Sequence, residues 1–277
     1  MDASLSCASL RYSIFDPTGN ITALVETPVA ISAQPVAAAS ILRRHPEVEQ
    51  VGFVRLAPSP AGEAADAELR MAGGEFCGNA TMSAGALLLL RRGEKAAGER
   101  RLRLRVSGAS HPVELCLRAA GEKGFLAGVC MPRALAVEER TFAFAGLCGR
   151  LQLVRMQGIS HLVIPDSSPF FSLMRDRERA ETALRTWCTS LSAECLGLMF
   201  LESGERLTPL VYVPGSGTVF WESSCASGTA AVGMALAAAK AGPVSLALQE
   251  PGGSLRVESD PAAETWLYGQ TRLVEER

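Results

Sequence analysis

The apolar residues of this chain fall mostly into short runs that are separated by polar turns containing Gly, Pro, Asn or Asp. Runs of this kind are typical of β-strands. In the first half the pattern predicts strands at 10–16, 22–26, 50–56, 67–71, 102–106, 113–117 and 126–131. In the second half it predicts strands at 151–156, 161–165, 198–202, 210–213, 218–222, 245–249, 255–258 and 265–274.

Four other stretches repeat their apolar residues at the helical spacing. They lie at 35–44, 77–92, 176–195 and 225–242. The second and the fourth are apolar nearly all round, and a helix without a polar face is buried. We therefore expect an α/β (α+β) fold in which mixed strands wrap around each of these two core helices.

The two buried helices begin with versions of one sequence. When 75–88 is aligned with 223–236 on Cys77 and Cys225, a Thr, a Gly and a final Leu fall in register. The segments that follow each helix also match. A duplication of this kind predicts two pseudo-symmetric domains, each of which contributes one thiol.

We expect the first domain to span 1–128 and to carry Cys77, with the C-terminal strand 264–277 pairing back onto it. The second domain is expected to span 129–263 and to carry Cys225. The active site would then lie in the cleft between the domains, with one sulfur on each side.

The composition is that of an ordinary globular protein, with 48% hydrophobic and 20% charged residues. A formal net charge of -2 gives no electrostatic reason to expect nucleic acid or an anionic membrane as a partner. The N-terminus lacks a basic start and no apolar run approaches the length of a membrane span, so we expect no signal peptide and a cytoplasmic location.

Cysteines stay reduced in the cytoplasm. Those outside the duplicated motif lie in apolar or strand-like patterns and are expected to be small buried hydrophobic residues: Cys7, Cys116, Cys130, Cys148, Cys188 and Cys195. The chain has no Cys-x-x-Cys pair, and His45, His111 and His161 are scattered, so we expect no metal site.

A cysteine at the start of a helix is placed to favour its thiolate. An ordinary thiol has a pKa of about 8.5. The helix dipole contributes up to about 2 kcal/mol. The N–H groups of Gly78 and Asn79, or of Ala226 and Ser227, add charge-assisted hydrogen bonds of about 1.5–3 kcal/mol. We therefore expect both thiols to have lowered pKa values. The alternative, that each cysteine merely packs at a helix start, is weakened by the duplication.

The same N–H groups can bind the carboxylate of an amino acid. One sulfur, as the thiolate, would remove the α-proton, and the other, as the thiol, would deliver a proton to the opposite face. The two thiols would titrate as a coupled pair. The product would be the mirror-image amino acid.

Segments 76–80 and 224–229 resemble the paired cysteine elements of the diaminopimelate epimerase-like superfamily, which also contains proline racemases and phenazine-biosynthesis-type isomerases. The resemblance covers almost the whole chain. It implies a diaminopimelate epimerase-like fold and a racemase that uses two cysteines and no cofactor. Ala80 and Thr81 replace a Gly and a nearby Arg of diaminopimelate epimerase itself, and Tyr212 lacks the acidic-basic pair that follows an aromatic there, which argues against a substrate with a second amino-acid head.

The chain resembles more closely the histidine racemase branch that supplies staphylopine-type opine metallophores. The segments that carry this resemblance are 17–20, 49–53, 75–83, 212–214, 221–225 and 251–254. They imply histidine as the substrate and metallophore biosynthesis as the context. Ala226 stands where the branch has Gly, which narrows the space beside the second cysteine.

The resemblance also implies which residues surround the substrate. Glu49 would accept a hydrogen bond from an imidazole or ammonium group, and Glu222 would tune the neighbouring thiol or hold a cationic group, unless both are solvated surface carboxylates. Asn20 and Gln50 match positions that contact the substrate head group, although Asn20 also suits a turn. His161 matches a histidine that relays protons, although it also suits a buried core position. The candidate site is thus Cys77 and Cys225 as catalytic residues, with Asn20, Glu49, Gln50, Gly78, Asn79, His161, Glu222, Ala226 and Ser227 as substrate-binding residues.

One alternative is set aside and two stay open. Lys95, Lys123 and Lys240 lack the context of a Schiff-base lysine, so a pyridoxal-phosphate racemase is set aside. Diaminopimelate or proline could replace histidine as the substrate. A non-catalytic thiol switch, in which Cys77 and Cys225 form a disulfide, is the alternative from another class. A homodimer is common among such folds, and the expected partner is a small-molecule amino acid.

Overall fold

The computed structural model describes residues 10–57, 64–94, 98–215 and 217–277. Cys7 and Lys95, which the sequence analysis considered, lie outside these ranges. The chain divides into two compact units, one formed by residues 1–130 and 268–277 and the other by residues 131–267. We refer to them as unit 1 and unit 2.

The sheet of unit 1 closes on itself. Its strands are β1 (Tyr12–Asp16), β2 (Thr22–Val25), β3 (Gln50–Arg55), β4 (Ala67–Met71), β5 (Arg100–Val106), β6 (Val113–Ala119), β7 (Gly124–Met131) and β16 (Thr265–Glu276). They are hydrogen-bonded in this order, and β16 pairs in turn with β1 in antiparallel fashion. The pairs β2–β3 and β4–β5 are parallel, and each is joined by a helix.

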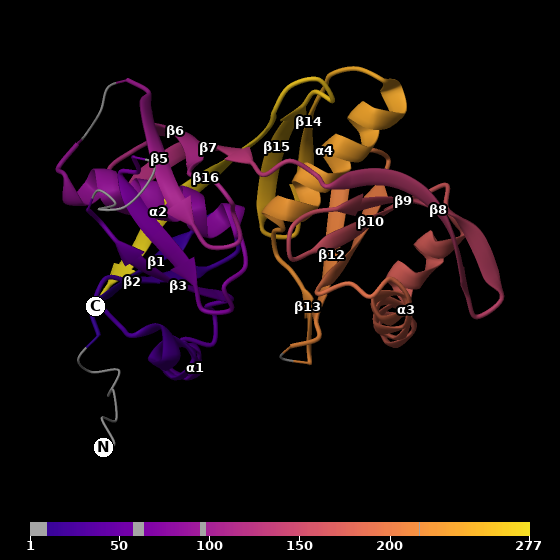
Figure 1. The fold of residues 1–277 in the computed structure, drawn as a ribbon, viewed down its shortest axis with the longest axis horizontal. Coiled ribbons are helices and arrows are strands. Elements are labelled where there is room, and N and C mark those ends of the chain that lie inside the picture. Colours follow the sequence, from indigo (N-terminus) through magenta and orange to yellow (C-terminus); the bar gives the residue numbers. More distant parts are fainter. Residues whose placement is uncertain (1–9, 58–63, 95–97, 216) are drawn as a thin grey trace. The chain divides into compact units, whose positions relative to one another are not determined.

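The helices of unit 1 cover and fill this sheet. The short turn η2 (Ile31–Ala33) leads into α1 (Gln34–Arg44), which packs on β3, and α2 (Gly78–Arg91) contacts β1 to β6 (Figure 1). Nearly every residue of α2 is buried. Gly85 lets α2 approach β6, because a Cβ there would lie 3.1 Å from Leu115 and 3.2 Å from Leu117. This is the strand-wrapped core helix that the sequence predicts.

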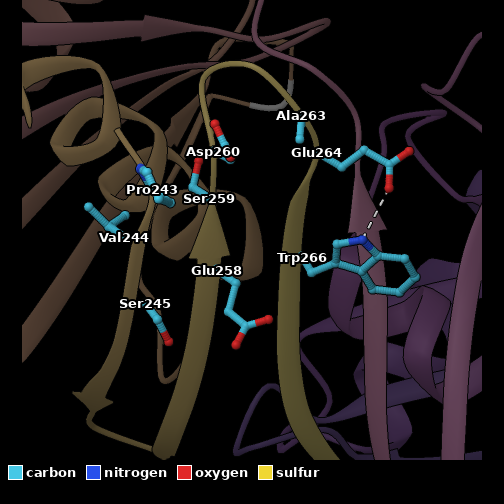
Figure 2. Close-up of a pocket in the computed structure, with 9 residues that line it drawn as sticks. All are labelled: Pro243, Val244, Ser245, Glu258, Ser259, Asp260, Ala263, Glu264 and Trp266. Carbon is cyan, nitrogen blue, oxygen red and sulfur yellow. Dashed lines mark hydrogen bonds between the residues drawn. The ribbon is translucent and has the colours of Figure 1, made fainter. Parts of the chain in front are cut away.

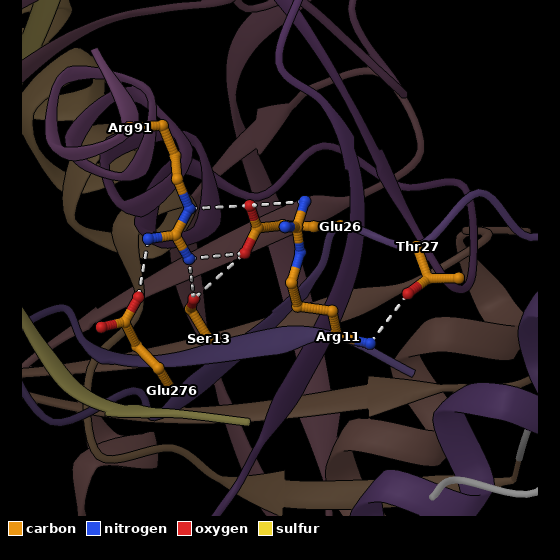
Figure 3. A network of polar contacts seen from close by, with 6 residues as sticks. All are labelled: Arg11, Ser13, Glu26, Thr27, Arg91 and Glu276. Atoms are coloured by element: carbon orange, nitrogen blue, oxygen red, sulfur yellow. Dashed lines mark hydrogen bonds and ion pairs between the residues drawn. The ribbon is translucent and has the colours of Figure 1, made fainter. Parts of the chain in front are cut away.

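A polar cluster ties the C-terminal end of α2 to three strands (Figure 3). The Arg91 guanidinium donates two hydrogen bonds to Glu26, just past β2, at 2.9 and 2.7 Å. It also donates to Glu276 of β16 at 2.6 Å and to the Ser13 hydroxyl of β1 at 3.2 Å. We call Arg91, Glu26, Glu276 and Ser13 the Arg91 cluster.

Unit 2 has the order β15-β14-β12-β11-β10-β9-β8, with β13 paired to β12. Its elements are β8 (Ala136–Phe144), β9 (Leu147–Arg155), β10 (Ser160–Pro165), η3 (Pro169–Arg175), α3 (Arg177–Ser190), β11 (Leu196–Glu202), β12 (Arg206–Val213), β13 (Thr218–Trp221), α4 (Ala226–Lys240), β14 (Val244–Glu250) and β15 (Gly253–Ser259). The pairs β10–β11 and β12–β14 are parallel.

Alternate residues of the central strands of unit 2 face different helices. Leu162 of β10 and Leu198 of β11 belong to the core that α3 covers, together with Trp187. Their neighbours His161 and Met199 point to α4 instead, because His161 contacts Ser227 and Met199 lies against Gly228. The sheet therefore lies between α3 and the buried helix α4, and Figure 1 shows α4 beside β14 and β15.

The structure corrects three details of the predicted elements. The helix predicted at 176–195 ends at Ser190. The turn η3 was not predicted, and neither was β8, whose middle is exposed and charged, with Glu138, Glu139 and Arg140 in place of an apolar alternation. β8 is an edge strand that pairs with β9 on one side. Such a strand buries little apolar surface, so its sequence shows little of the alternation of apolar and polar residues that predicts a strand.

Candidate functional site

Cys225 caps the N-terminus of α4 with its side chain. Its sulfur accepts a hydrogen bond from the Gly228 N–H at 3.4 Å, and its carbonyl accepts one from the Thr229 N–H at 2.9 Å. A Cβ on residue 228 would overlap Met199 and would lie 3.1 Å from the Cys225 sulfur. A side chain at position 228 would therefore displace the end of Met199 on β11 and crowd the Cys225 sulfur.

Two carboxylates lie against Cys225. Glu250, at the end of β14, accepts a hydrogen bond from the Cys225 N–H at 2.7 Å and another from the Thr229 hydroxyl. The Glu222 side chain is hydrogen-bonded to the thiol itself. Burial raises the pKa of the Cys225 thiol well above its usual range, and the charges of Glu222 and Glu250 add to the effect.

This result contradicts the expectation that the helix start lowers both thiol pKa values. The helix dipole and the N–H groups favour the thiolate, but Cys225 is only 5% exposed, and desolvation of a charge can shift a pKa by several units. Two neighbouring acidic groups act in the same direction as burial. Cys225 is therefore a thiol, not a thiolate, in this structure at neutral pH.

His161 is linked to Cys225 through a hydroxyl. Its Nε2 lies 3.0 Å from the Ser227 oxygen, which in turn lies 3.6 Å from the Cys225 sulfur. Burial lowers the pKa of His161 to about 3, so the ring is neutral. Its Nδ1 is buried and has no hydrogen-bond partner among the described residues. Cys225, Ser227 and His161 thus form a chain of polar contacts whose members are all uncharged at neutral pH.

Cys77 occupies the same capping position on α2. Its sulfur accepts a hydrogen bond from the Ala80 N–H at 3.5 Å, and its carbonyl accepts bonds from the N–H and hydroxyl of Thr81 at 2.9 and 2.7 Å. The first turns of α2 and α4 therefore share their sulfur-to-amide contacts. The sequence repeat is also a repeat of local geometry.

The loop before each cysteine is held from the strand that follows the helix. In unit 1 the Ser107 hydroxyl donates to the Glu75 carbonyl at 2.8 Å, and in unit 2 the Gly252 N–H donates to the Ser223 carbonyl at 2.7 Å. Both carbonyls lie two residues before the cysteine. Gly108, with φ of +74°, presses so closely on the backbone of the first loop that a Cβ would overlap it.

Asn20 and Glu49 lie together in unit 1. The Asn20 amide donates to the Glu49 carboxylate at 2.8 Å, and Asn20 is 2% exposed. The turn before Asn20 is fixed by Thr18 and Gly19, both at positive φ, and by the Thr18 hydroxyl donating to the Gln270 carbonyl at 3.1 Å. Gln50 follows Glu49 in the chain and is the first residue of β3.

Residues 9–268 of the chain match the family described as the histidine racemase CntK N-terminal domain. The chain belongs to this family. It is accordingly an amino-acid racemase, an isomerase, as the sequence predicts, and its substrate is a small-molecule amino acid.

Curated relatives agree with this assignment. A histidine racemase from Fusobacterium nucleatum is 30% identical over 232 residues, which cover 81% of this chain and 79% of that protein. A histidine racemase from Staphylococcus aureus strain Mu50 is 29% identical over 227 residues, again 81% of this chain and 79% of that protein.

Solved structures share the fold at much lower identity. A predicted epimerase from Pseudomonas aeruginosa has a TM-score of 0.70 at 18% identity, over 97% of this chain and 98% of that one. A hydroxyproline epimerase from Agrobacterium vitis has a TM-score of 0.68 at 12% identity, over 97% of this chain and 91% of that one. The predicted epimerase-like fold is confirmed.

The residues predicted from the sequence form one group in unit 2 and two sets in unit 1. In unit 2 the racemase brings together Cys225, Ala226, Ser227, Glu222 and His161. In unit 1, Gly78 and Asn79 are the first residues of α2, after Cys77, whereas Asn20, Glu49 and Gln50 lie around the start of β3.

Glu250 is not among the site residues that the sequence predicts. The available signal was its place directly before the Pro-Gly-Gly turn that matches a turn in the other half. A charged residue directly before such a turn is expected to be exposed. Glu250 is nevertheless only 3% exposed, because α4 packs over it.

Other features of the racemase lie outside these groups. An open cavity is lined by Pro243, Val244, Ser245, Glu258, Ser259, Asp260, Ala263, Glu264 and Trp266 (Figure 2). Its lining residues Pro243 to Ser245 follow the C-terminal end of α4, whereas Cys225 caps the N-terminal end of the same helix. Within the described residues no helix is both long and apolar enough to cross a membrane. Nor does that part of the chain gather three or more His, Cys, Asp or Glu side chains that could hold a metal ion.

Proposed function

We propose that this protein interconverts L- and D-histidine without a cofactor, with Cys77 and Cys225 acting on opposite faces of the α-carbon. The match of residues 9–268 to a histidine racemase domain carries the proposal. The matching capping geometry of the two cysteines supports it, because both sulfurs have the same relation to a helix N-terminus.

The reaction is a proton exchange at one carbon. The α C–H bond breaks, its proton goes to a thiolate, and the electron pair is delocalised from the α-carbon into the substrate carboxylate. The S–H bond of the other thiol then breaks, and its proton forms a new C–H bond on the opposite face. The N–H groups of Gly78, Asn79, Ala226 and Ser227, at the starts of α2 and α4, are suited to binding the carboxylate.

Carboxylates among the candidate residues are suited to the cationic parts of histidine. Glu222 lies beside the thiol of Cys225 and can accept a hydrogen bond from an ammonium group. Glu49, already paired with Asn20, can accept one from the imidazole or the ammonium group. We place the enzyme in the cytoplasm, where both thiols stay reduced. Supply of D-histidine for opine metallophore synthesis remains a prediction from the resemblance.

The first test is α-proton exchange in D2O under reducing conditions and without added cofactor. L-histidine, LL-diaminopimelate and L-proline are offered separately, and NMR follows the α-proton signal. We expect loss of the signal with histidine and at least a 1000-fold lower rate in Cys77→Ala and in Cys225→Ala, roughly the loss seen when a residue that reacts covalently or transfers a proton is removed.

The matched control is Cys148→Ala. Cys148 of β9 is exposed, not buried as the sequence predicts, and its removal should leave the rate unchanged. Exchange with proline or diaminopimelate alone would keep the mechanism and overturn histidine as the substrate. Exchange that survives both Cys77→Ala and Cys225→Ala would overturn the two-thiol mechanism.

A further inference from the structure

One buried group breaks the repeat between the two units. β5 and β14 have the same role, since each follows its core helix and ends at the turn that holds the cysteine loop. β5 ends with Val106, and β14 ends with Glu250. Both residues are 3% exposed, so a buried carboxyl in unit 2 corresponds to a buried isopropyl group in unit 1.

Glu250 is held in one orientation by residues of α4. One carboxylate oxygen accepts the Cys225 N–H at 2.7 Å, and the other accepts the Thr229 hydroxyl. In unit 1 the corresponding hydroxyl, that of Thr81, donates to the Cys77 carbonyl at 2.7 Å instead. The first turns of α2 and α4 thus differ in the partner of the Thr hydroxyl and in the bond from the Cys225 N–H, while the contacts of the cysteine sulfur and carbonyl with helix N–H groups are the same.

The ionisable groups that face this site come from three elements. Glu250 comes from β14, Glu222 from the segment before α4, and His161 from β10 through Ser227. His161 is neutral, so the charges that act on Cys225 are negative. A carboxylate beside a thiol disfavours the thiolate, since two like charges in a buried site repel.

The order of ionisation within the cluster follows from these contacts. Burial raises the pKa of Glu250 to about 8, against the opposing effect of its two hydrogen-bond donors, and Glu222 raises it further. The pKa of Cys225 is raised well above 9. As the pH rises, Glu250 loses its proton before Cys225 does.

We propose that Glu250 is a positioning residue that holds Cys225 as the thiol in the substrate-free enzyme, which makes Cys225 the proton donor and Cys77 the base. This inference rests on the proposed two-thiol mechanism. The α-proton goes to the Cys77 sulfur as the C–H bond breaks, and the electron pair stays on the substrate. The Cys225 S–H bond then breaks, its proton forms the new C–H bond, and Cys225 is left as a thiolate until the next proton exchange.

The test is an NMR titration of protein labelled with 13C at the cysteine β-carbon, whose resonance differs between thiol and thiolate. Cys77→Ala and Cys225→Ala assign the two signals. In the wild-type protein Cys77 is expected to titrate at lower pH than Cys225. In Glu250→Gln, which keeps an acceptor for the Cys225 N–H but loses the charge, the Cys225 titration should move down by about one pH unit or more, and Cys77 should not move.

Two controls separate charge from structure. Glu250→Asp keeps the charge and should leave the Cys225 titration near its wild-type position. Glu258→Gln removes a carboxylate on β15 and should move neither thiol. An unchanged Cys225 titration in Glu250→Gln would overturn the proposal. So would a wild-type protein in which Cys225 titrates before Cys77, a measurement that does not depend on any variant folding.

The titration needs no substrate, so it is independent of the proposed function. A protein inactive on histidine could still show the expected titrations, and an active racemase could fail to show them. If the protein is active, the alkaline limb of kcat/KM should shift to lower pH in Glu250→Gln while the acid limb stays in place. A purely structural role for Glu250 would lower activity without moving either limb.

Discussion

Cys225 shows how the surroundings of a residue can outweigh its local position. Its capping role favours the thiolate through the helix dipole and the Gly228 N–H. Its burial opposes this and prevails, and the charge of Glu222 and, once it is ionised, that of Glu250 act in the same direction as burial. Cys225 is therefore protonated at neutral pH, because the desolvation of a sulfur anion costs more free energy than one helix terminus contributes.

His161 carries a prediction about stability against pH. Its pKa is lowered from about 6.5 in the unfolded chain to about 3 in the folded one. Below pH 6.5 the unfolded chain binds a proton that the folded chain does not, so the free energy of unfolding falls as the pH falls. Linkage gives a loss of about 2 kcal/mol by pH 5.

His161→Gln should remove this dependence. Urea unfolding at pH 7 and pH 5 would show a smaller difference between the two pH values in His161→Gln than in the wild type. His111→Gln, which changes an exposed histidine, should keep the wild-type difference. An equal difference in wild type and His161→Gln would show that His161 is not buried as a neutral ring.

The C-terminal end of α2 shows what one helix terminus contributes at the scale of an element. Arg91 binds Glu26 and Glu276 and also lies in the last turn, where a cation complements the helix dipole. Burial alone would raise the pKa of Glu26, but the hydrogen bonds and charge of Arg91 outweigh it, and the pKa is lowered. The Arg91 cluster thereby joins a helix to β1, β2 and β16.

Arg91→Ala should destabilise the protein by about 1–3 kcal/mol, because it leaves the Glu26 side chain, 3% exposed, without its main partner. The comparison is Arg92→Ala, which removes an arginine paired with Asp66 at 3.4 Å on the surface and should cost about 1 kcal/mol or less. Urea unfolding at pH 7 measures both.

The sign of the pH effect checks the mechanism. The Glu26 contribution is present above its unfolded pKa of 4.5 and is lost as the pH falls through its folded pKa. The difference in the free energy of unfolding between Arg91→Ala and the wild type should therefore become smaller at acid pH. An equal loss of unfolding free energy in Arg91→Ala and Arg92→Ala would show that the Arg91 cluster stabilises the protein no more than a surface ion pair does.

At the scale of the whole molecule, unit 1 is completed by the last strand of the chain. β16 pairs with β1 in a register that sets Leu273 opposite Phe15 and Arg272 opposite Asp16. A closed sheet has no unpaired edge. The contact between Ser83 of α2 and Thr271 of β16, at 2.9 Å, also links the core helix to this strand.

Adjacent residues of β16 provide the test of closure. Leu273 is 7% exposed and Val274 is 55% exposed. Leu273→Asp should cost about 3 kcal/mol or more, because it places an unpaired charge in the core, and Val274→Asp should change stability by about 0.5 kcal/mol or less. Thermal unfolding followed by circular dichroism compares them. Similar midpoints for the two variants would contradict the placement of β16.

Agreement between sequence and structure was best where a local pattern specified an element. The strand predicted at 67–71 was found at those residues, and α1 began one residue before its prediction. The positions of the two cysteines at helix starts were predicted, because capping, small following residues and duplication all lie within short segments. Glu250 was not, because its burial depends on α4 and β14 packing together.

The sequence by itself determined the elements, the repeat that places Cys77 and Cys225 at helix starts, and membership of a racemase family. These depend on periodicity, capping and motif spacing, which are local properties of a chain. Only the tertiary structure decided that Glu250 meets Cys225, that burial keeps His161 neutral, and that β16 pairs with β1 in a register that closes the sheet of unit 1. The pKa of a group and the pairing of distant strands depend on which residues exclude water around them, and residues far apart in the chain supply that environment.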